Sequence, residues 1–174
     1  MKEIVSPLDK KIIRSLKAGD EVLFDGVLYT ARDQAHQRLV DALTQGKKLP
    51  IDLKESIIYY CGPTQTPIGK AIGSCGPTTS RRMDSFTPAL VKSGLRAMIG
   101  KGDRSVEVAA ALKKYGAVYF LTYAGCGALL SKYVRRSTLV AYKGLGPEAI
   151  YRLEVRDFPL IVGIDARGKS VFKK

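Results

Sequence analysis

Tryptophan is absent from this sequence, histidine occurs once, and cysteine occurs only three times in 174 residues. The cysteines, Cys61, Cys75 and Cys126, are widely spaced and form no Cys-x-x-Cys pair. We therefore expect neither a structural zinc site nor a disulfide framework, and no metal held by this chain alone. One cysteine donated to a metal centre shared with another chain stays open. Otherwise each is expected to be a reduced thiol in an intracellular protein.

Long hydrophobic runs are absent as well. The longest, such as residues 117–121, are far too short to span a membrane. The first residues, Met-Lys-Glu-Ile-Val-Ser-Pro, lack the apolar stretch of a signal peptide. With 45% hydrophobic residues, the chain is expected to form one domain over residues 1–174. We expect it in the cytoplasm, without a membrane partner.

Acidic residues are few: 16 against 29 lysines and arginines, which gives a formal net charge of +13. A solvated basic surface, nucleic-acid binding and a site for small anionic substrates could each explain this excess. The basic residues are spread from Lys2 to Lys174, and no aromatic-glycine signature of an RNA-binding strand occurs. Nucleic acid is therefore not expected as a partner, but a basic nucleic-acid-binding domain stays the alternative of another class.

Residues 73–84 (GSCGPTTSRRMD) combine glycine and proline with four hydroxyl side chains and two arginines. This mixture suits an anion site, because glycines allow close backbone approach, hydroxyls donate hydrogen bonds, and arginine matches a carboxylate with two parallel bonds. The alternative is a turn followed by a capped helix start, since Ser and Thr also favour N-cap positions.

The pattern of apolar residues and turn residues predicts a mixed α/β domain. Residues 20–30 are expected to form a hairpin around the Asp25-Gly26 pair, and no element is assigned before them. A helix capped by Thr30, with Asp33 at its third position, is expected to end near Gly46. The remaining predictions are a strand at 56–60, a loop at 64–76, a Thr87-capped helix through Met98, an Asp103-capped helix ending at Tyr115, a strand at 117–121, a short helix within 127–133, and strands at 138–142, 151–155, 160–164 and 170–172.

Two element ends add cations to the candidate anion site. Arg32 lies in the first turn of its helix and His36 is expected on the same face, near exposed amides that favour anions. Lys101 lies between two glycines and is expected close to the backbone. The ordinary alternatives are a surface or half-buried histidine and an exposed lysine after a helix C-cap.

Four segments together resemble one known family. Residues 31–36 (ARDQAH), 59–63 (YYCGP), 76–84 (GPTTSRRMD) and 99–102 (IGKG) are similar to the β-subunit, or C-terminal, region of class I fumarate hydratases. This iron–sulfur hydro-lyase family also contains L-tartrate dehydratase. The similarity runs from about residue 5 to the C-terminus and includes residues 154–159 (EVRDFP). It implies a mixed-sheet swivelling β/β/α fold.

The resemblance also implies that the chain is half of an enzyme that reversibly hydrates fumarate to L-malate, a step of the tricarboxylic acid cycle. In the family, three cysteines of the α region hold a 4Fe-4S cluster, whose open iron is a Lewis acid for the leaving hydroxyl. None of the three cysteines here falls on a family ligand position. We therefore expect a hetero-oligomer in which a separate α-subunit holds the cluster.

The family's functional positions imply roles for residues of this chain. The cations would bind the substrate carboxylates, and Thr78 would take a proton from the carbon beside one of them. An unassisted alcohol is a weak base, so Thr78 needs nearby cations or a group of the partner subunit. The candidate substrate-binding residues are Arg32, His36, Thr79, Arg82 and Lys101, and the candidate catalytic residues are Thr78, Arg82 and Lys101.

Two further interpretations stay open. The chain could be the β-subunit of an L-tartrate dehydratase, because no residue separates the two substrates. It could also be a purely structural or regulatory subunit whose partner does all the chemistry, in which case Thr78→Ala would leave turnover intact.

Overall fold

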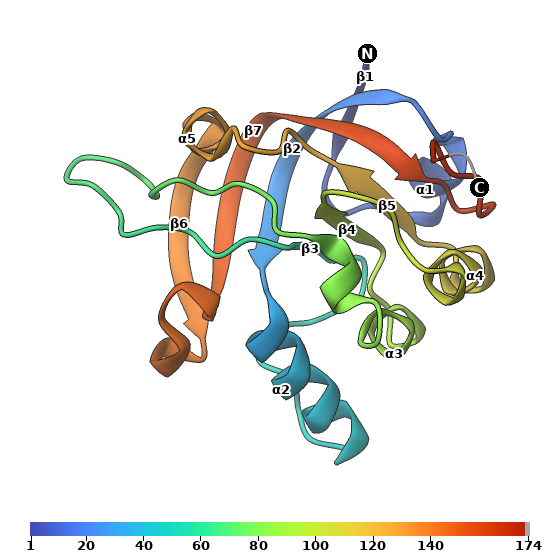
Figure 1. Ribbon diagram of the computed structural model, residues 1–174, viewed down its shortest axis with the longest axis horizontal. Helices are drawn as coiled ribbons and strands as arrows, with labels where there is room; N and C mark the ends of the chain where they lie inside the picture. Colours follow the sequence, from blue (N-terminus) through green and yellow to red (C-terminus); the bar gives the residue numbers. More distant parts are fainter. Residues whose placement is uncertain (173–174) are drawn as a thin grey trace.

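The computed structural model describes residues 1–172 (Figure 1). In this range seven strands form one mixed sheet. They are β1 (Lys2–Val5), β2 (Glu21–Thr30), β3 (Ile57–Tyr59), β4 (Ala97–Gly100), β5 (Val118–Leu121), β6 (Val134–Ala141) and β7 (Ile150–Ile164).

The long strand β7 closes this sheet. Strands β2, β3, β4 and β5 are parallel neighbours, and β7 runs antiparallel to both β2 and β5. β7 therefore joins the two ends of the parallel set into a barrel-like ring, along which its curved ribbon runs in Figure 1. β1 pairs parallel with the start of β2, and β6 pairs antiparallel with β7. The predicted α/β class with a mixed sheet is confirmed.

Helices connect the strands, and some of them cover one side of the sheet. The α-helices of the described range are α1 (Lys10–Ser15), α2 (Asp33–Thr44), α3 (Thr87–Lys92), α4 (Val106–Tyr115) and α5 (Gly127–Leu130), and the 3-10 helices are η1 (Ser80–Met83), η2 (Ser131–Tyr133) and η3 (Lys143–Glu148). Figure 1 shows α2, α3 and α4 together on the same side of the strands. Within residues 1–172, no helix has the length and apolar character needed to cross a membrane.

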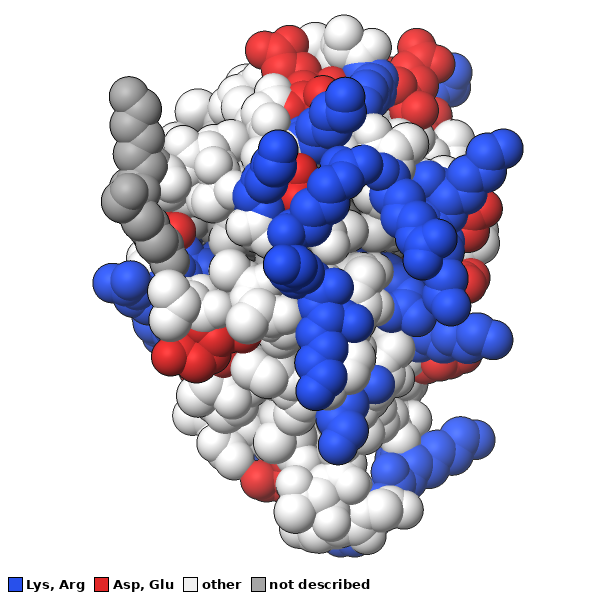
Figure 2. Space-filling view, turned by 90° about the vertical axis from the view of Figure 1, so that its right-hand side faces the viewer, with Lys and Arg blue, Asp and Glu red and all other residues white. Residues whose placement is uncertain are grey.

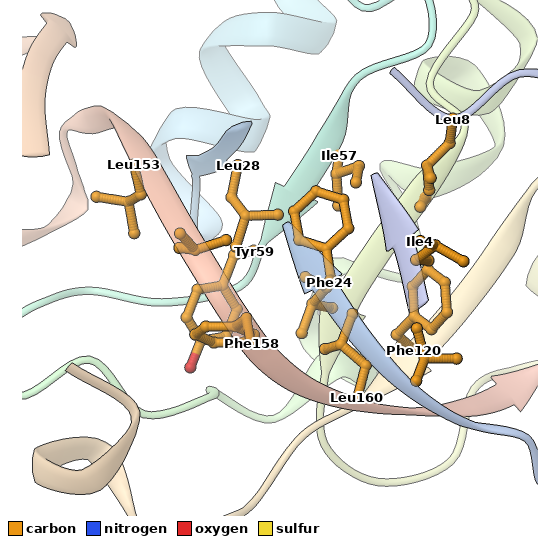
Figure 3. Close-up of a cluster of buried hydrophobic side chains, with 14 of the residues drawn as sticks. Ile4, Leu8, Phe24, Leu28, Ile57, Tyr59, Phe120, Leu153, Phe158 and Leu160 are labelled. Atoms are coloured by element: carbon orange, nitrogen blue, oxygen red, sulfur yellow. The ribbon is translucent and has the colours of Figure 1, made fainter. Parts of the chain in front are cut away.

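Two clusters of buried side chains stabilise the fold. The first lies inside the ring of strands, where Phe24, Tyr59 and Phe158 point toward one another (Figure 3). The second, which includes Leu39 and Leu112, lies between the sheet and helices α2, α3 and α4. β4 and β5 contribute alternate residues to both clusters. Strands buried on both faces need continuous apolar runs, which explains why residues 117–121 were recognisable from sequence.

Residues 20–30 do not form the predicted hairpin. They form the single strand β2, which pairs with β7 along most of its length. The Asp25-Gly26 pair belongs to a bulge, because the register with β7 shifts between Phe24 and Gly26, and Gly26 has a φ of 134°. The long pairing with β7 outweighs the local turn signal.

The predicted helix through Met98 is also wrong beyond its first half. α3 ends at Lys92, Gly94 turns the chain with a φ of 114°, and β4 then enters between β3 and β5. A short apolar run fits a buried strand as well as a helix, and here the sheet contacts decide. The next helix, α4, is capped by Ser105 and not by Asp103.

The two ends of the chain differ from the sequence prediction as well. β1 and α1 lie within residues 1–20, to which no element was assigned. The strands predicted at 151–155 and 160–164 are one strand, β7, and residues 170–172 contribute only a single bridge, from Ser170 to Ile164. The strands at 56–60 and 117–121 and the helix ending near Gly46 are confirmed.

Candidate active site

Three predicted site segments meet at the carboxyl ends of β3 and β4. These strands are parallel neighbours, so the residues that follow them leave from the same edge of the sheet. The loop that contains Thr78 returns to this edge, where the Thr78 amide donates a 2.7 Å hydrogen bond to the Tyr60 carbonyl. The next residue, Thr79, forms a parallel bridge with Lys101. The fold therefore brings residues 60–62, 78–83 and 100–102 together.

Ser80 locks the last two of these segments to each other. Its amide donates to the Lys101 carbonyl at 3.1 Å, and its hydroxyl accepts from the Lys101 amide at 3.0 Å. Gly100 is required beside it, because a Cβ there would overlap the Ser80 hydroxyl and press on the Tyr60 ring. The Tyr119 hydroxyl lies 2.9 Å from Ser80 Oγ and 2.8 Å from the carbonyl oxygen of Gly102. Burial raises the pKa of Tyr119, so the phenol remains a hydrogen-bond donor.

Arg82 is fixed to the start of α2. Its Nε and Nη2 donate to the two carboxylate oxygens of Asp33 at 3.0 and 2.8 Å. This two-point contact orients the guanidinium, while 51% of the Arg82 side chain stays exposed. Arg32 is the N-cap of α2, without a side-chain capping bond. Thr30 is not the cap as predicted: its hydroxyl bonds to the Ala149 carbonyl and accepts from the Tyr151 amide.

Arg32 lies over the glycine that follows β3. A Cβ on Gly62 would lie 2.8 Å from Arg32 Nη1 and 2.9 Å from Arg32 Cδ, so a side chain there would force Arg32 to shift. Arg32 Nε is buried and has no hydrogen-bond partner within residues 1–172. Its only ion pair in that range is a loose one, 4.0 Å from Asp33 Oδ2. Arg32 therefore keeps donors available beside the loop edge.

His36 lies beneath this edge and has no exposed surface. Its Nδ1 is 2.8 Å from the Arg32 carbonyl oxygen, to which the neutral ring donates. The ring packs against Tyr60 and Phe86, with centroid distances of 5.2 and 5.9 Å. Its Nε2 is also buried and has no hydrogen-bond partner within residues 1–172. Direct binding of substrate by His36 stays a prediction, and the contact that the fold gives its Nδ1 is with the backbone of Arg32.

His36 should make the fold weaker in acid. Burial, together with the charge of Arg104, lowers the pKa of His36 from 6.5 to about 4 although the hydrogen bond to Arg32 opposes this. His36 is then protonated near pH 6.5 in the unfolded chain but only near pH 4 in the folded chain. The free energy of unfolding therefore falls as the pH falls from about 6.5 to about 4. We expect this group to lower the free energy of unfolding by about 2 kcal/mol between pH 7 and pH 5.

Urea denaturation at both pH values measures this effect. The His36→Phe variant has no group that titrates at this position, so its stability should fall by correspondingly less. An equal fall in both proteins would show that other groups cause it.

Thr78, Thr79 and Lys101 offer groups that the fold leaves unused. Thr79 is exposed, and Thr78 and Lys101 are partly buried. Within the described range, neither threonine hydroxyl makes a hydrogen bond, and the Lys101 ammonium makes no ion pair. Their backbones are nevertheless fixed by the bridge and the hydrogen bonds of the loop edge. The arrangement thus presents two hydroxyls and a cation in defined positions.

A family model described as Fumarase C-terminus matches residues 3–174. The chain belongs to this family. The resemblance recognised in residues 31–36, 59–63, 76–84 and 99–102 is thereby confirmed.

Relatives in the Fumarase C-terminus family differ in how much of their length this chain covers. A Methanocaldococcus jannaschii protein, provisionally named L(+)-tartrate dehydratase subunit beta, is 40% identical over 180 residues, which cover 100% of this chain and 92% of the relative. The aerobic class I fumarate hydratase of Escherichia coli K12 is 37% identical over 176 residues, which cover 100% of this chain but 31% of the relative. Fumarate hydratase 2 of Leishmania major is 37% identical, and the match covers 99% of this chain and 31% of the relative.

The cysteines of this family member do not form a cluster-binding set. Cys61 and Cys75 are fully buried, and Cys126 is partly buried. The hydrogen bond to Cys75 and burial raise the pKa of Cys61 well above its usual value, which disfavours the thiolate that a metal needs. Within residues 1–172, no three His, Cys, Asp or Glu side chains come together as ligands. That a separate subunit holds a 4Fe-4S cluster stays a prediction.

Proposed function

We propose that this chain is the β-subunit of an iron–sulfur hydro-lyase that reversibly hydrates fumarate to L-malate. This proposal rests on one observation: three segments, residues 60–62, 78–83 and 100–102, lie together at one edge of the sheet. It gives the chain a place where cations and hydroxyls face solvent from fixed backbone. The proposal assigns this edge to substrate binding.

The charges at the edge suit a dicarboxylate. Arg82, held by Asp33, can offer its remaining N–H donors to one carboxylate, and Arg32 has a buried Nε without a partner in the described range. Lys101 adds a third cation on a backbone locked to Ser80. When a proton leaves the carbon beside a carboxylate, negative charge spreads into that carboxylate. Cations already in place stabilise it there without reorganisation.

Thr78 is the proposed proton acceptor of this chain. Its amide is bound to Tyr60, so its position is fixed, while its hydroxyl has no partner within residues 1–172. Among the described residues, no carboxylate or imidazole is bonded to that hydroxyl to activate it. A threonine alkoxide therefore depends on the cations of the edge or on a group of the partner subunit. Thr79 is proposed to donate a hydrogen bond to the substrate.

We propose that a separate α-subunit holds the 4Fe-4S cluster and completes the active site in a hetero-oligomer. The three thiols of this chain do not fit such a cluster. The relatives named fumarate hydratase are long enough to contain a second part, because this chain covers only 31% of each.

L-tartrate is the second candidate substrate. The relative that this chain covers almost completely carries a tartrate dehydratase name. Fumarate, malate and tartrate are all dicarboxylates, so the same cations suit each of them.

The experiment is co-expression with the candidate α-subunit, anaerobic reconstitution of iron and sulfide, and an ultraviolet assay of fumarate loss beside an L-tartrate assay. Fumarate turnover that is lost in Arg82→Ala is the expected result. Turnover of tartrate alone would change the substrate and keep the site. If Thr78→Ala kept full activity in an intact complex, the role of Thr78 would be wrong and the partner would do the proton transfer.

A basic face elsewhere on the molecule favours the nucleic-acid alternative and allows it to be tested. Figure 2 shows lysines and arginines gathered on the side of the molecule that lies at the right of Figure 1. A cavity of about 510 Å³ is lined by five cations, namely Lys10, Arg14, Lys113, Lys114 and Arg167. If a cluster-loaded complex consumed neither dicarboxylate, salt-dependent binding of nucleic acid to this face would be the next measurement.

A further inference from the structure

A long arm, residues 63–73, projects from the molecule between two segments of the candidate site. It is the loop that reaches furthest to the left in Figure 1, beside α5 and β6. Residues 64–70 are all exposed, and Ile68 at its tip is 104% exposed. The arm belongs to the connection between β3 and η1, residues 60–79, which contains no helix or strand. Connections of that length are uncommon in compact domains and are usually functional.

The base of the arm is fixed. The Thr64 amide donates to the Ser74 carbonyl at 3.0 Å, and the Ser74 amide donates to Thr64 Oγ1 at 2.8 Å. Gly73 allows the two sides to approach, because a Cβ there would collide with the backbone oxygens of Thr64 and Gln65. Ile72, which is 4% exposed, anchors the returning side in the core. The arm is therefore presented by a rigid base.

The tip of the arm forms a defined turn but is exposed to solvent. The Lys70 amide donates to the Pro67 carbonyl at 3.1 Å, which closes a turn around Ile68 and Gly69. Pro63 and Pro67 limit the freedom of the chain on this side. A large apolar side chain held out in solvent by such a turn is typical of an anchor that a partner buries, because little entropy is lost when it binds.

The position of the arm points to its partner. It leaves the body after Gly62, over which Arg32 lies, and it returns just before Thr78. A cavity of about 560 Å³ separates it from α5 and the start of β6, lined among others by Ile72, Lys132 and Val134. A protein that buried the tip and filled this cavity would lie against the candidate active site.

We propose that the arm docks into the α-subunit, with Ile68 in an apolar pocket of that subunit. This inference rests on the proposed function. The coverage of the relatives supports this occupant. This chain covers 92% of the Methanocaldococcus jannaschii relative named subunit beta but 31% of the Escherichia coli fumarate hydratase, whose remaining length is enough to contain a counterpart of the α-subunit. Lys70 is the one charged residue of the arm, so the pocket needs an apolar floor and hydrogen-bond acceptors at its rim.

Ile68→Asp tests the proposal without disturbing the fold, because the side chain contacts solvent only. The dissociation constant of the co-expressed, reconstituted complex is measured by sedimentation or interferometry for the wild type and the variant. We expect at least about a tenfold weaker complex with Ile68→Asp, equivalent to ~1.4 kcal/mol. Ile68→Leu, which keeps an apolar side chain, should restore most of the affinity.

Val171→Asp is the matched control. Val171 is an exposed apolar residue whose amide donates to the Gly163 carbonyl near the end of β7. The end of β7 lies on the opposite side of Figure 1 from the arm, so the replacement should leave the affinity as in the wild type. Equal affinity of Ile68→Asp and the wild type would overturn the proposal. It would also be overturned if Ile68→Asp changed only the self-association of the isolated chain, since a second copy would then occupy the arm. A complex that assembles through Ile68 but consumes neither dicarboxylate would refute the proposed function and not the docking.

Discussion

Replacing Asp84 with alanine is expected to lower the free energy of unfolding by about 3–5 kcal/mol. The Asp84 carboxylate accepts a hydrogen bond from Arg104 Nε at 2.6 Å, and the Arg104 side chain is completely buried. Burial by itself lowers the pKa of Arg104, but contacts with Tyr60 and Asp84 outweigh it and raise the pKa. Arginine stays protonated in proteins even when it is buried, so the substitution would leave a buried charge without its counter-ion. Urea denaturation measures the loss.

The surroundings of Arg104 explain why little else could replace the carboxylate. Arg104 Nη2 donates to Thr87 Oγ1 at 2.7 Å, and its guanidinium lies over the rings of Tyr60 and Tyr119, 5.3 and 4.9 Å from their centroids. Arg104 Nη1 already lacks a partner within residues 1–172. Rings compensate a buried charge only in part.

Two variants control for general effects of the substitution. Glu154→Ala removes an exposed ion pair with Arg152 and should cost less than about 1 kcal/mol. Asp84→Ala combined with Arg104→Leu removes both charges and should be more stable than Asp84→Ala alone, because no unpaired buried charge remains. A cost below about 1 kcal/mol for Asp84→Ala alone would contradict the role given to this ion pair.

Several elements of the fold could be predicted from local sequence because their signals are local. The apolar run at 117–121 has the length of a buried strand, and the helix that ends near Gly46 shows helical periodicity. The Asp25-Gly26 pair misled the prediction. Whether such a pair turns or bulges depends on β7, which lies more than a hundred residues further along the chain.

The candidate site was predicted as a set of segments but not as a structure. Thr78, Arg82 and Lys101 were recognisable because they lie in short strings rich in glycine and hydroxyl residues. Ser80 was counted only as one of the hydroxyl residues of 73–84, and Tyr119, which bonds to it, gave no comparable signal. Tyr119 belongs to a buried strand, and its contact with Ser80 spans 39 residues of sequence. The one available hint was Gly100, whose missing side chain makes room for Ser80.

His36 shows the limit of arguments from helix faces. The spacing correctly placed its side chain beside the turn that contains Arg32. Spacing cannot tell whether that face meets solvent or the core, and here Tyr60 and Phe86 cover it. Burial of this kind depends on where other elements pack.

The Lys101→Met variant should lower kcat/KM for the dicarboxylate by about 10²- to 10³-fold in a reconstituted complex. Lys101 is fixed through its backbone, which bonds to Ser80 and pairs with Thr79. Its ammonium makes no ion pair within the described residues, so a substrate carboxylate does not have to displace one. Loss of this cation removes stabilisation at the point where negative charge develops. Steady-state kinetics at saturating α-subunit measure the effect.

Lys113→Met is the matched control, because Lys113 belongs to the basic face at the end of α4. Like Lys101→Met, it removes one positive charge and introduces a methionine side chain. We expect kcat/KM of Lys113→Met to stay as in the wild type. The comparison separates the two explanations of the basic composition. A dicarboxylate site needs Lys101 far more than Lys113, whereas sequence-independent binding of nucleic acid depends on the number of cations and treats the two lysines alike. Similar losses in both variants would therefore contradict the assignment of Lys101 to the active site.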